Sequence, residues 1–347
     1  MIKNRNYSLD LLRVIACYLV IQQHASEFYY IGEGGTVVTG DNTFWIGIIT
    51  TLCRSSVPLF VMLSGFLLLP MQDKISTFFR KRFTRIIYPF IAWCVLYAGY
   101  YVLSRGDSFS QMALNILHIP VNFGCEIGHL WYIYMLIGLY LVTPIISPWL
   151  QQASKRELEG YLGLWIITTF LPYIHLVYPE VLGEAFWNDT PLLYYFTGFF
   201  ILGYYLKRFG YPSAALSWII LIVGFALSAG IFCSRIDTVP TVPELELSWG
   251  FCTVNVFLMT LGLFSLIGRL SLKGKNAACK LLSDISVKSY GMYLAHILFL
   301  NFYYGLFKSI SDAAYVTIPL IAVCTFITVY IFVYLLSYLP KSKYIIG

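Results

Sequence analysis

The chain has 347 residues, of which 59% are hydrophobic and 12% are charged, and its mean hydropathy is +0.73. A soluble domain carries about 25% charged residues, so this composition excludes an ordinary soluble fold and predicts an integral membrane protein. The net charge of +6 does not indicate a nucleic-acid partner, because a membrane protein places Lys and Arg according to its topology.

Ten apolar stretches approach the length of about 20 residues that a membrane helix needs. They are Leu9–Tyr29, Phe44–Leu69, Ile86–Leu103, Leu130–Leu150, Tyr161–Tyr178, Pro191–Leu206, Ala214–Cys233, Trp249–Ile267, Tyr290–Phe307 and Tyr315–Leu339. The sixth is short and the fifth is interrupted at Pro172, so these two are expected to be tilted, broken or partly re-entrant. The predicted fold is an all-α bundle of about ten transmembrane helices, forming a single domain over residues 1–347 without a soluble domain.

The positions of the basic residues predict the orientation of this bundle. With the N-terminus in the cytoplasm, 19 of the 23 Lys and Arg residues fall in inner segments. The outer loops then hold Arg105, Arg235 and Lys308, and Arg54 lies inside the second stretch. Because cytoplasmic loops carry an excess of Lys and Arg, both termini are expected in the cytoplasm.

The first stretch carries a seam of polar residues. Arg13 and His24 are eleven steps apart, which on a helix places them ~16 Å apart and within ~20° of one face. Asp10 lies three residues before Arg13, and Glu27 lies three residues after His24, so each has a neighbour on the same face. A charge at mid-bilayer costs about 2.5–3.5 kcal/mol, so this face is expected to line a wet cavity. The alternative is that Asp10 and Arg13 anchor the helix at the headgroups and that His24 is a packing residue.

A basic segment and one isolated arginine are further candidates for binding anionic groups. The segment from Lys74 to Arg85 is read as an inner loop next to the membrane, with cations that could grip phosphates: Arg80, Lys81, Arg82 and Arg85. Positive-inside topology or contact with anionic lipid explains the same cluster without a ligand. Arg54, just before Pro58, is a candidate to stabilise an oxyanion, and its alternative role is an ion pair with Glu27 or another buried acid.

Aromatic residues and cysteines complete the set of candidates. His129 begins the fourth stretch beside Trp131 and Tyr132, which suit either an interfacial aromatic belt or stacking on a sugar ring. His296 is expected to make core hydrogen bonds. The eight cysteines show no metal or redox spacing, so no metal is expected. Cys125 and Cys233 fall at the expected outer face, where a disulfide is the alternative to two free thiols.

Five segments together resemble the membrane acyltransferase family 3. They are LDLLRVIACYLVIQQH, VPLFVMLSGFLLL, KRFTRIIYP, GHLWYIYMLIGLYLVTPII and SYGMYLAHILFL, in that order. The first resembles the family signature of an arginine and a histidine with ten residues between them on the first helix, here Arg13 and His24. The likeness runs from Asp10 to about Leu339.

The resemblance implies an acyl-CoA-dependent membrane acyltransferase, in bacteria a multi-pass protein of the inner (plasma) membrane. It implies acetyl-CoA as the donor, bound by the basic segment, and a hydroxyl of an extracytoplasmic or lipid-linked saccharide as the acceptor. The family's basic motif has arginine where Lys81 stands, and lysine cannot form the same bidentate contact. The resemblance also favours an acceptor site around His129, Trp131 and Tyr132.

Alternatives remain open for the mechanism and for the class of protein. His24 suits either a general base or a residue that carries the acyl group itself, and Glu27 either orients it or is an interfacial residue. Succinyl or another acyl group would use the same fold. A secondary transporter for a saccharide would also show intramembrane charges, but such carriers tend to have internal repeats, and none is visible here. A sensory or ligand-binding membrane module is the third reading.

Overall fold

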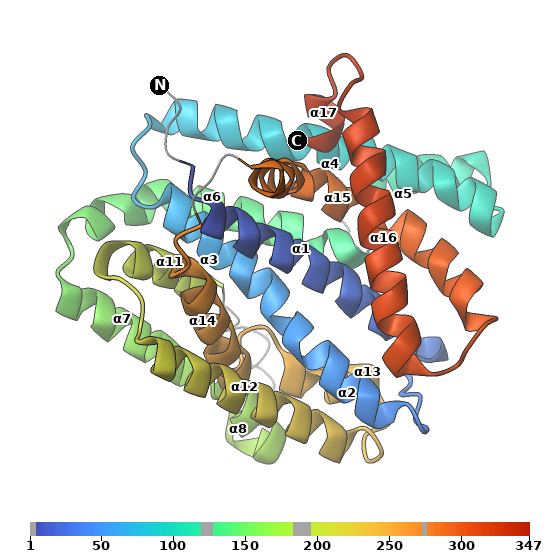
Figure 1. Ribbon diagram of the computed structural model, residues 1–347, viewed down its shortest axis with the longest axis horizontal. Helices are drawn as coiled ribbons and strands as arrows, with labels where there is room; N and C mark the ends of the chain where they lie inside the picture. Colours follow the sequence, from blue (N-terminus) through green and yellow to red (C-terminus); the bar gives the residue numbers. More distant parts are fainter. Residues whose placement is uncertain (1–4, 119–127, 183–195, 273–275) are drawn as a thin grey trace.

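The computed structural model describes residues 5–118, 128–182, 196–272 and 276–347, and its regular structure in these ranges is helical (Figure 1). Two isolated antiparallel bridges join 31 to 37 and 36 to 241. The α-helices are α1 (Tyr7–Glu27), α2 (Thr43–Thr51), α3 (Ser56–Leu68), α4 (Ile75–Arg105), α5 (Phe109–His118), α6 (Trp131–Gln152), α7 (Lys155–Thr168), α8 (Leu171–Val177), α9 (Pro179–Leu182), α11 (Thr197–Phe209), α12 (Ala214–Arg235), α13 (Val242–Glu246), α14 (Val254–Gly268), α15 (Ala277–Lys308), α16 (Ala314–Leu336) and α17 (Lys343–Ile346). Short 3₁₀ turns precede or connect some of them: η1 (Glu33–Gly35), η2 (Leu52–Ser55), η3 (Gly128–Leu130) and η5 (Leu247–Trp249).

Five helical stretches in the described part of the chain are long and apolar enough to cross a membrane: Thr43–Leu68, α4, Gly128–Gln152, α12 and α16. A sixth span results if Val242–Trp249 and α14, which meet at a bend of 46°, are counted together. The remaining predicted spans correspond to helices that are shorter or more polar, namely α1, α7 with α8, α11 and α15. An all-helical multi-pass membrane fold is therefore confirmed, and the count of ten spans and the orientation stay predictions.

Helix α1 runs through the middle of the bundle, where it contacts α3, α14, α15 and α16 (Figure 1). Its start is fixed by Asn6, whose side chain accepts a hydrogen bond of 3.0 Å from the backbone N–H of Ser8. One side of α1, with Leu12 and Ala16, packs into an apolar cluster with α3, α11 and α14. Another side, with Ile21 and Ala25, packs into a second cluster with α4, α15 and α16. Helix α1 therefore separates two cores, and its polar seam lies between them.

Two glycines let α3 and α11 approach each other closely. A Cβ atom on Gly65 would lie 1.8 Å from the carbonyl oxygen of Phe200, and one on Gly203 would lie 2.0 Å from that of Met62. Small residues permit such backbone contact between membrane helices. The contact fixes α3, and with it the η2 turn that carries Arg54.

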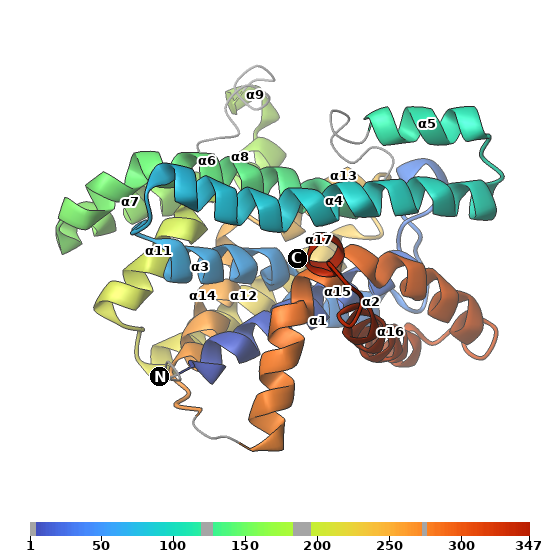
Figure 2. The ribbon, with the colours of Figure 1, turned by 90° about the horizontal axis from the view of Figure 1, so that it is seen from above.

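The structure corrects the predicted basic loop and adds helices outside the predicted spans. The basic segment read as a loop is helical from Ile75, because α4 begins there and continues without a break to Arg105. The fifth predicted span is broken, as expected: α7 ends at Thr168, and Pro172 lies in the first turn of α8. Helices α5 and α13 were not predicted, and α5 lies along the outer side of α4 (Figure 2).

Two predictions fall partly outside the described residues. The start of the sixth span, residues 191–195, and Cys125 of the alternative disulfide are among them. Cys233 packs against α2, where a Cβ atom on Gly47 would lie 2.6 Å from its Sγ atom.

Candidate active site

A cavity of about 910 Å³ lies between α1, α3, α4, α6, α13 and α15. We call it the central cavity. At one end it is lined by Arg82 and Arg85 of α4, and at the other by His24 and Glu27 of α1. Further lining residues are Arg13, Gln23, Arg54, Ser56, His129, Trp131, Tyr132, Tyr140, Glu246, Phe251, Ser286, Tyr290 and Tyr293. The predicted cavity beside the polar seam of α1 is therefore present.

His24 and Glu27 form a dyad one turn apart on α1. Nδ1 of His24 lies 2.7 Å from Oε2 of Glu27. The carboxylate can only accept, so Nδ1 carries the proton of the neutral imidazole and Nε2 is left with a lone pair. This arrangement of a carboxylate, an imidazole and a free Nε2 atom is the one that general-base catalysis uses.

Two further imidazoles surround His24. The ring centroid of His24 lies 5.3 Å from that of His296 and 6.4 Å from that of His129. Nδ1 of His296 lies 2.6 Å from the carbonyl oxygen of Tyr293, so His296 makes the core hydrogen bond expected of it. His129 lines the central cavity and is 8% exposed.

Arg54 is held in a buried ion pair at the same end of the cavity. Its Nη2 atom donates to Oε1 of Glu246 at 2.9 Å and to the hydroxyl of Tyr30 at 3.1 Å. The hydroxyl of Tyr30 also donates to Glu246, and the guanidinium lies 4.6 Å from the ring centroid of Trp249. The acid that pairs with Arg54 is therefore Glu246 of α13, whose side chain is partly exposed, and Nε of Arg54 has no hydrogen-bond partner in the described part of the chain.

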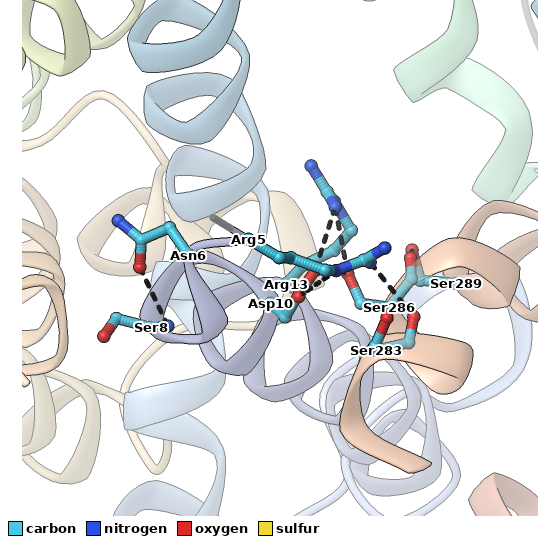
Figure 3. Close-up of polar contacts among 8 residues, drawn as sticks. All are labelled: Arg5, Asn6, Ser8, Asp10, Arg13, Ser283, Ser286 and Ser289. Carbon is cyan, nitrogen blue, oxygen red and sulfur yellow. Dashed lines mark hydrogen bonds and ion pairs between the residues drawn. The ribbon is translucent and has the colours of Figure 1, made fainter. Parts of the chain in front are cut away.

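The N-terminal end of α1 forms a second polar network, which Figure 3 shows. Asp10 binds Arg5 through two hydrogen bonds, of 2.6 Å to Nε and 3.0 Å to Nη2. Its contact with Nη1 of Arg13 is longer, at 3.9 Å. The hydroxyl of Ser286 connects the two, because it donates to Asp10 at 2.7 Å and accepts from Arg13 at 2.9 Å. Arg13 therefore lines the cavity, whereas Asp10 contacts Arg13 and is not part of the cavity lining.

The four cations of the basic segment lie in different places. Arg82 and Arg85 line the central cavity, whereas Arg80 and Lys81 line a separate surface pocket of about 400 Å³. Arg85 lines both. Lys81 is exposed and forms an ion pair of 3.0 Å with Asp73. Only two of the four residues predicted to bind one ligand therefore lie on the central cavity.

Trp131 and Tyr132, at the start of α6, form part of the cavity wall. The ring of Trp131 stacks on Phe251 at 5.6 Å between centroids, and that of Tyr132 lies 5.6 Å from Tyr293. This aromatic wall lies on the cavity together with His129, which precedes α6 in η3.

Several lining residues were not among the sequence candidates. Glu246 lies between two predicted spans and was not singled out, and Gln23 was read only as part of the first helix. Ser286 and Tyr290 of α15 also line the cavity. The signal for Gln23 was its position next to His24, and nothing in the sequence joined Glu246 to Arg54.

Comparison with known sequences agrees with this chemistry. The sequence model of the protein family described as "Acyltransferase domain" matches residues 6–338, which is almost the whole chain. A search of curated proteins and of solved structures gives no significant match. Because the match covers almost the whole chain, the chain belongs to the acyltransferase family 3 of membrane acyltransferases.

Proposed function

We propose that the protein transfers an acyl group, most simply acetyl, from cytoplasmic acyl-CoA to a hydroxyl of an extracytoplasmic or lipid-linked saccharide. The observation that supports this proposal is the central cavity, which joins Arg82 and Arg85 to the His24–Glu27 dyad. Arginines suit the phosphates of the donor, since their planar fork binds such groups bidentately. An imidazole with a free lone pair suits the removal of a proton from a hydroxyl.

The proposed reaction uses His24 as its base. The acceptor oxygen attacks the carbonyl carbon of the thioester while Nε2 of His24 takes the hydroxyl proton. The C–S bond then breaks, and the imidazolium returns the proton to the sulfur of the leaving thiolate. Glu27 holds Nδ1 and stabilises the imidazolium that forms. If His24 instead carries the acyl group, the same Nε2 atom is the nucleophile.

Arg13 and Arg54 have different proposed roles. Arg13 lies ~16 Å from His24 along α1, so we assign it to the donor end together with Arg82 and Arg85. Arg54 lies at the His24 end and places positive charge near the oxygen that becomes anionic in the tetrahedral intermediate. Asp10 positions Arg13 through Ser286. His129, Trp131 and Tyr132 are assigned to the acceptor, because aromatic walls stack on sugar rings.

The Arg82–Arg85 end is proposed to face the cytoplasm, in agreement with the excess of Lys and Arg in the inner segments. In this orientation the thioester enters from the cytoplasm and the acceptor reaches His24 from the opposite side. A bacterial inner membrane provides both substrates in this arrangement.

The direct test is acyl transfer by the full chain in lipid nanodiscs with radiolabelled acetyl-CoA and an extract of cell-envelope saccharides. We expect label in the saccharide fraction with the native chain, and a loss of at least 100-fold with His24→Ala. His118→Ala, at the exposed end of α5, is the matched control and should keep full activity. Full activity of His24→Ala would refute the proposed mechanism, and absence of transfer from any acyl-CoA would refute the function.

A further inference from the structure

Buried polar atoms without hydrogen-bond partners gather at the His24 end of the central cavity. Oε1 of Gln23, Nε of Arg54, Oγ of Ser56 and Nε2 of His129 are all in this state. All four side chains line the cavity. A buried polar atom without a partner is costly, so these atoms indicate the chemistry of a ligand that completes the site.

Gln23 presents an acceptor. Its side chain lies close to Glu27, the partner of His24. A carboxylate can only accept, so the amide nitrogen of Gln23 is the atom that suits Glu27, and the buried carbonyl atom Oε1 has no hydrogen-bond partner. Gln23 is 7% exposed. Its free oxygen therefore lies in the wall of the cavity directly beside the dyad.

His129 presents a second acceptor. The backbone of Leu294 lies beside its ring, and because the N–H of Leu294 is used within α15, its carbonyl oxygen suits a proton on Nδ1 of His129. Nε2 is buried and has no hydrogen-bond partner, in keeping with a proton on Nδ1. Nε2 of His129 is then a lone pair, and its ring centroid is 6.4 Å from that of His24.

These atoms require a ligand that both donates and accepts. An ammonium group only donates and would leave Nε of Arg54 without a partner, whereas a phosphate only accepts and would leave Gln23 and His129 unpaired. Hydroxyl groups do both. We infer that Gln23 and His129 bind a second hydroxyl of the acceptor, next to the one that His24 deprotonates, so that the protein acylates polyols in preference to simple alcohols. This inference rests on the proposed function and adds two residues that determine acceptor specificity.

The test compares acceptors and variants on the full chain in nanodiscs. A panel of methyl hexosides, their monodeoxy analogues and 1-propanol serve as probes, measured both by calorimetric binding without donor and by acyl transfer from acetyl-CoA. We expect at least one hexoside to be preferred over 1-propanol by roughly 100-fold or more, and removal of one neighbouring hydroxyl to lower kcat/KM roughly tenfold. Gln23→Met and His129→Leu should each lower the ratio of hexoside to 1-propanol roughly tenfold and leave KM for acetyl-CoA unchanged.

Matched controls separate this role from a general loss of structure. Gln22→Met removes the neighbouring amide, which bonds the carbonyl oxygen of Ile49, and His118→Leu removes a surface imidazole. Neither residue lines the cavity, so neither should change the ratio. His129→Gln keeps an acceptor atom and should restore part of the preference.

The inference is overturned if hexosides and 1-propanol bind and react equally well, or if Gln23→Met and His129→Leu reduce both to the same extent. Selective binding of hexosides without acyl transfer would refute the proposed function and leave the inference standing.

Discussion

Arg54 of η2 and Glu246 of α13 form an ion pair of 2.9 Å at the wall of the central cavity, although 192 residues separate them in the chain. The side chain of Arg54 is 4% exposed and that of Glu246 is 30% exposed. The two partners therefore differ in how well water can solvate them when the other is removed.

This difference predicts an asymmetric effect of mutation. Glu246→Ala leaves a buried guanidinium without its counter-ion and should lower the free energy of unfolding by about 3–5 kcal/mol. Arg54→Met leaves a carboxylate that water still reaches, so it should cost less. Thermal unfolding in detergent measures both. The exposed pair Lys155–Glu159 is the control, where Glu159→Ala should change stability by less than about 1 kcal/mol. A larger loss with Arg54→Met would contradict the expected order.

The dyad predicts a change in rate without a change in fold. Glu27→Gln keeps the size of the side chain but removes the charge that stabilises the imidazolium of His24, so kcat should fall roughly 10²–10⁴-fold. KM for acyl-CoA should change little, because the donor end is distant along α1. Glu33→Gln in η1, an exposed acid at the same end of α1, is the control and should keep the native kcat. An unchanged kcat in Glu27→Gln would show that Glu27 does not assist His24.

The residues of the basic segment lie on two different pockets, so mutating them should affect the KM for acyl-CoA unequally. Arg82→Ala and Arg85→Ala should each raise KM for acyl-CoA roughly 10–100-fold, since each removes a charge-assisted contact within the cavity. Lys81→Ala should change KM much less, because Lys81 is exposed, pairs with Asp73 and lines only the surface pocket. Initial rates at varied acetyl-CoA give these values. Equal effects of Lys81→Ala and Arg82→Ala would place the donor across both pockets.

Ser286 links Asp10 and Arg13, and this link predicts a loss of stability when its hydroxyl group is removed. Ser286→Ala removes hydrogen bonds to two charged groups and should lower the free energy of unfolding by about 1.5–3 kcal/mol. Ser283 provides a matched control on the same helix, because Arg5 bonds its backbone oxygen and Ser283→Ala keeps that atom. Chemical unfolding curves compare the two variants, and equal stabilities would show that the Ser286 bridge contributes nothing.

The contact between α3 and α11 predicts a steric effect. Gly65→Ala and Gly203→Ala place a methyl group within 2.0 Å of a backbone oxygen, so each should destabilise the fold by at least about 1–3 kcal/mol. Gly99→Ala in α4 and Gly138→Ala in α6 meet no atom within 4 Å and should be neutral or slightly stabilising. The melting temperatures in detergent distinguish these pairs, and a stable Gly65→Ala variant would contradict the close approach.

Features that depend on residues close together in the chain could be predicted from the sequence. The spacing of Arg13, His24 and Glu27 on one helix follows from helix geometry, and the structure places all three on one cavity. The break near Pro172 follows from the chemistry of proline. The basic segment was misread because its charges suggested a loop, whereas its apolar residue Phe78 is buried and continues the face of α4.

Contacts between distant segments could not be predicted in this way. Nothing near Arg54 indicated Glu246, because only the return of α13 to η2 brings the two together. The pairing of Asp10 with Arg13 followed from their separation of three residues, but Arg5 reaches the carboxylate with two nitrogen atoms and makes the closer bonds. The position of Gln23 beside His24 did not show that its carbonyl oxygen lies on the cavity without a partner, because that depends on how α1 packs.

Because Arg13 and His24 belong to one unbroken helix, the separation of the two ends of the cavity does not adapt to the substrate. An α-helix has a constant rise per residue, so in the proposed reaction α1 fixes the distance between the arginines that would bind the donor's phosphates and the Nε2 atom of His24, the proposed base. A donor with a longer or shorter arm between its phosphates and its thioester would place the carbonyl carbon at the wrong distance from His24.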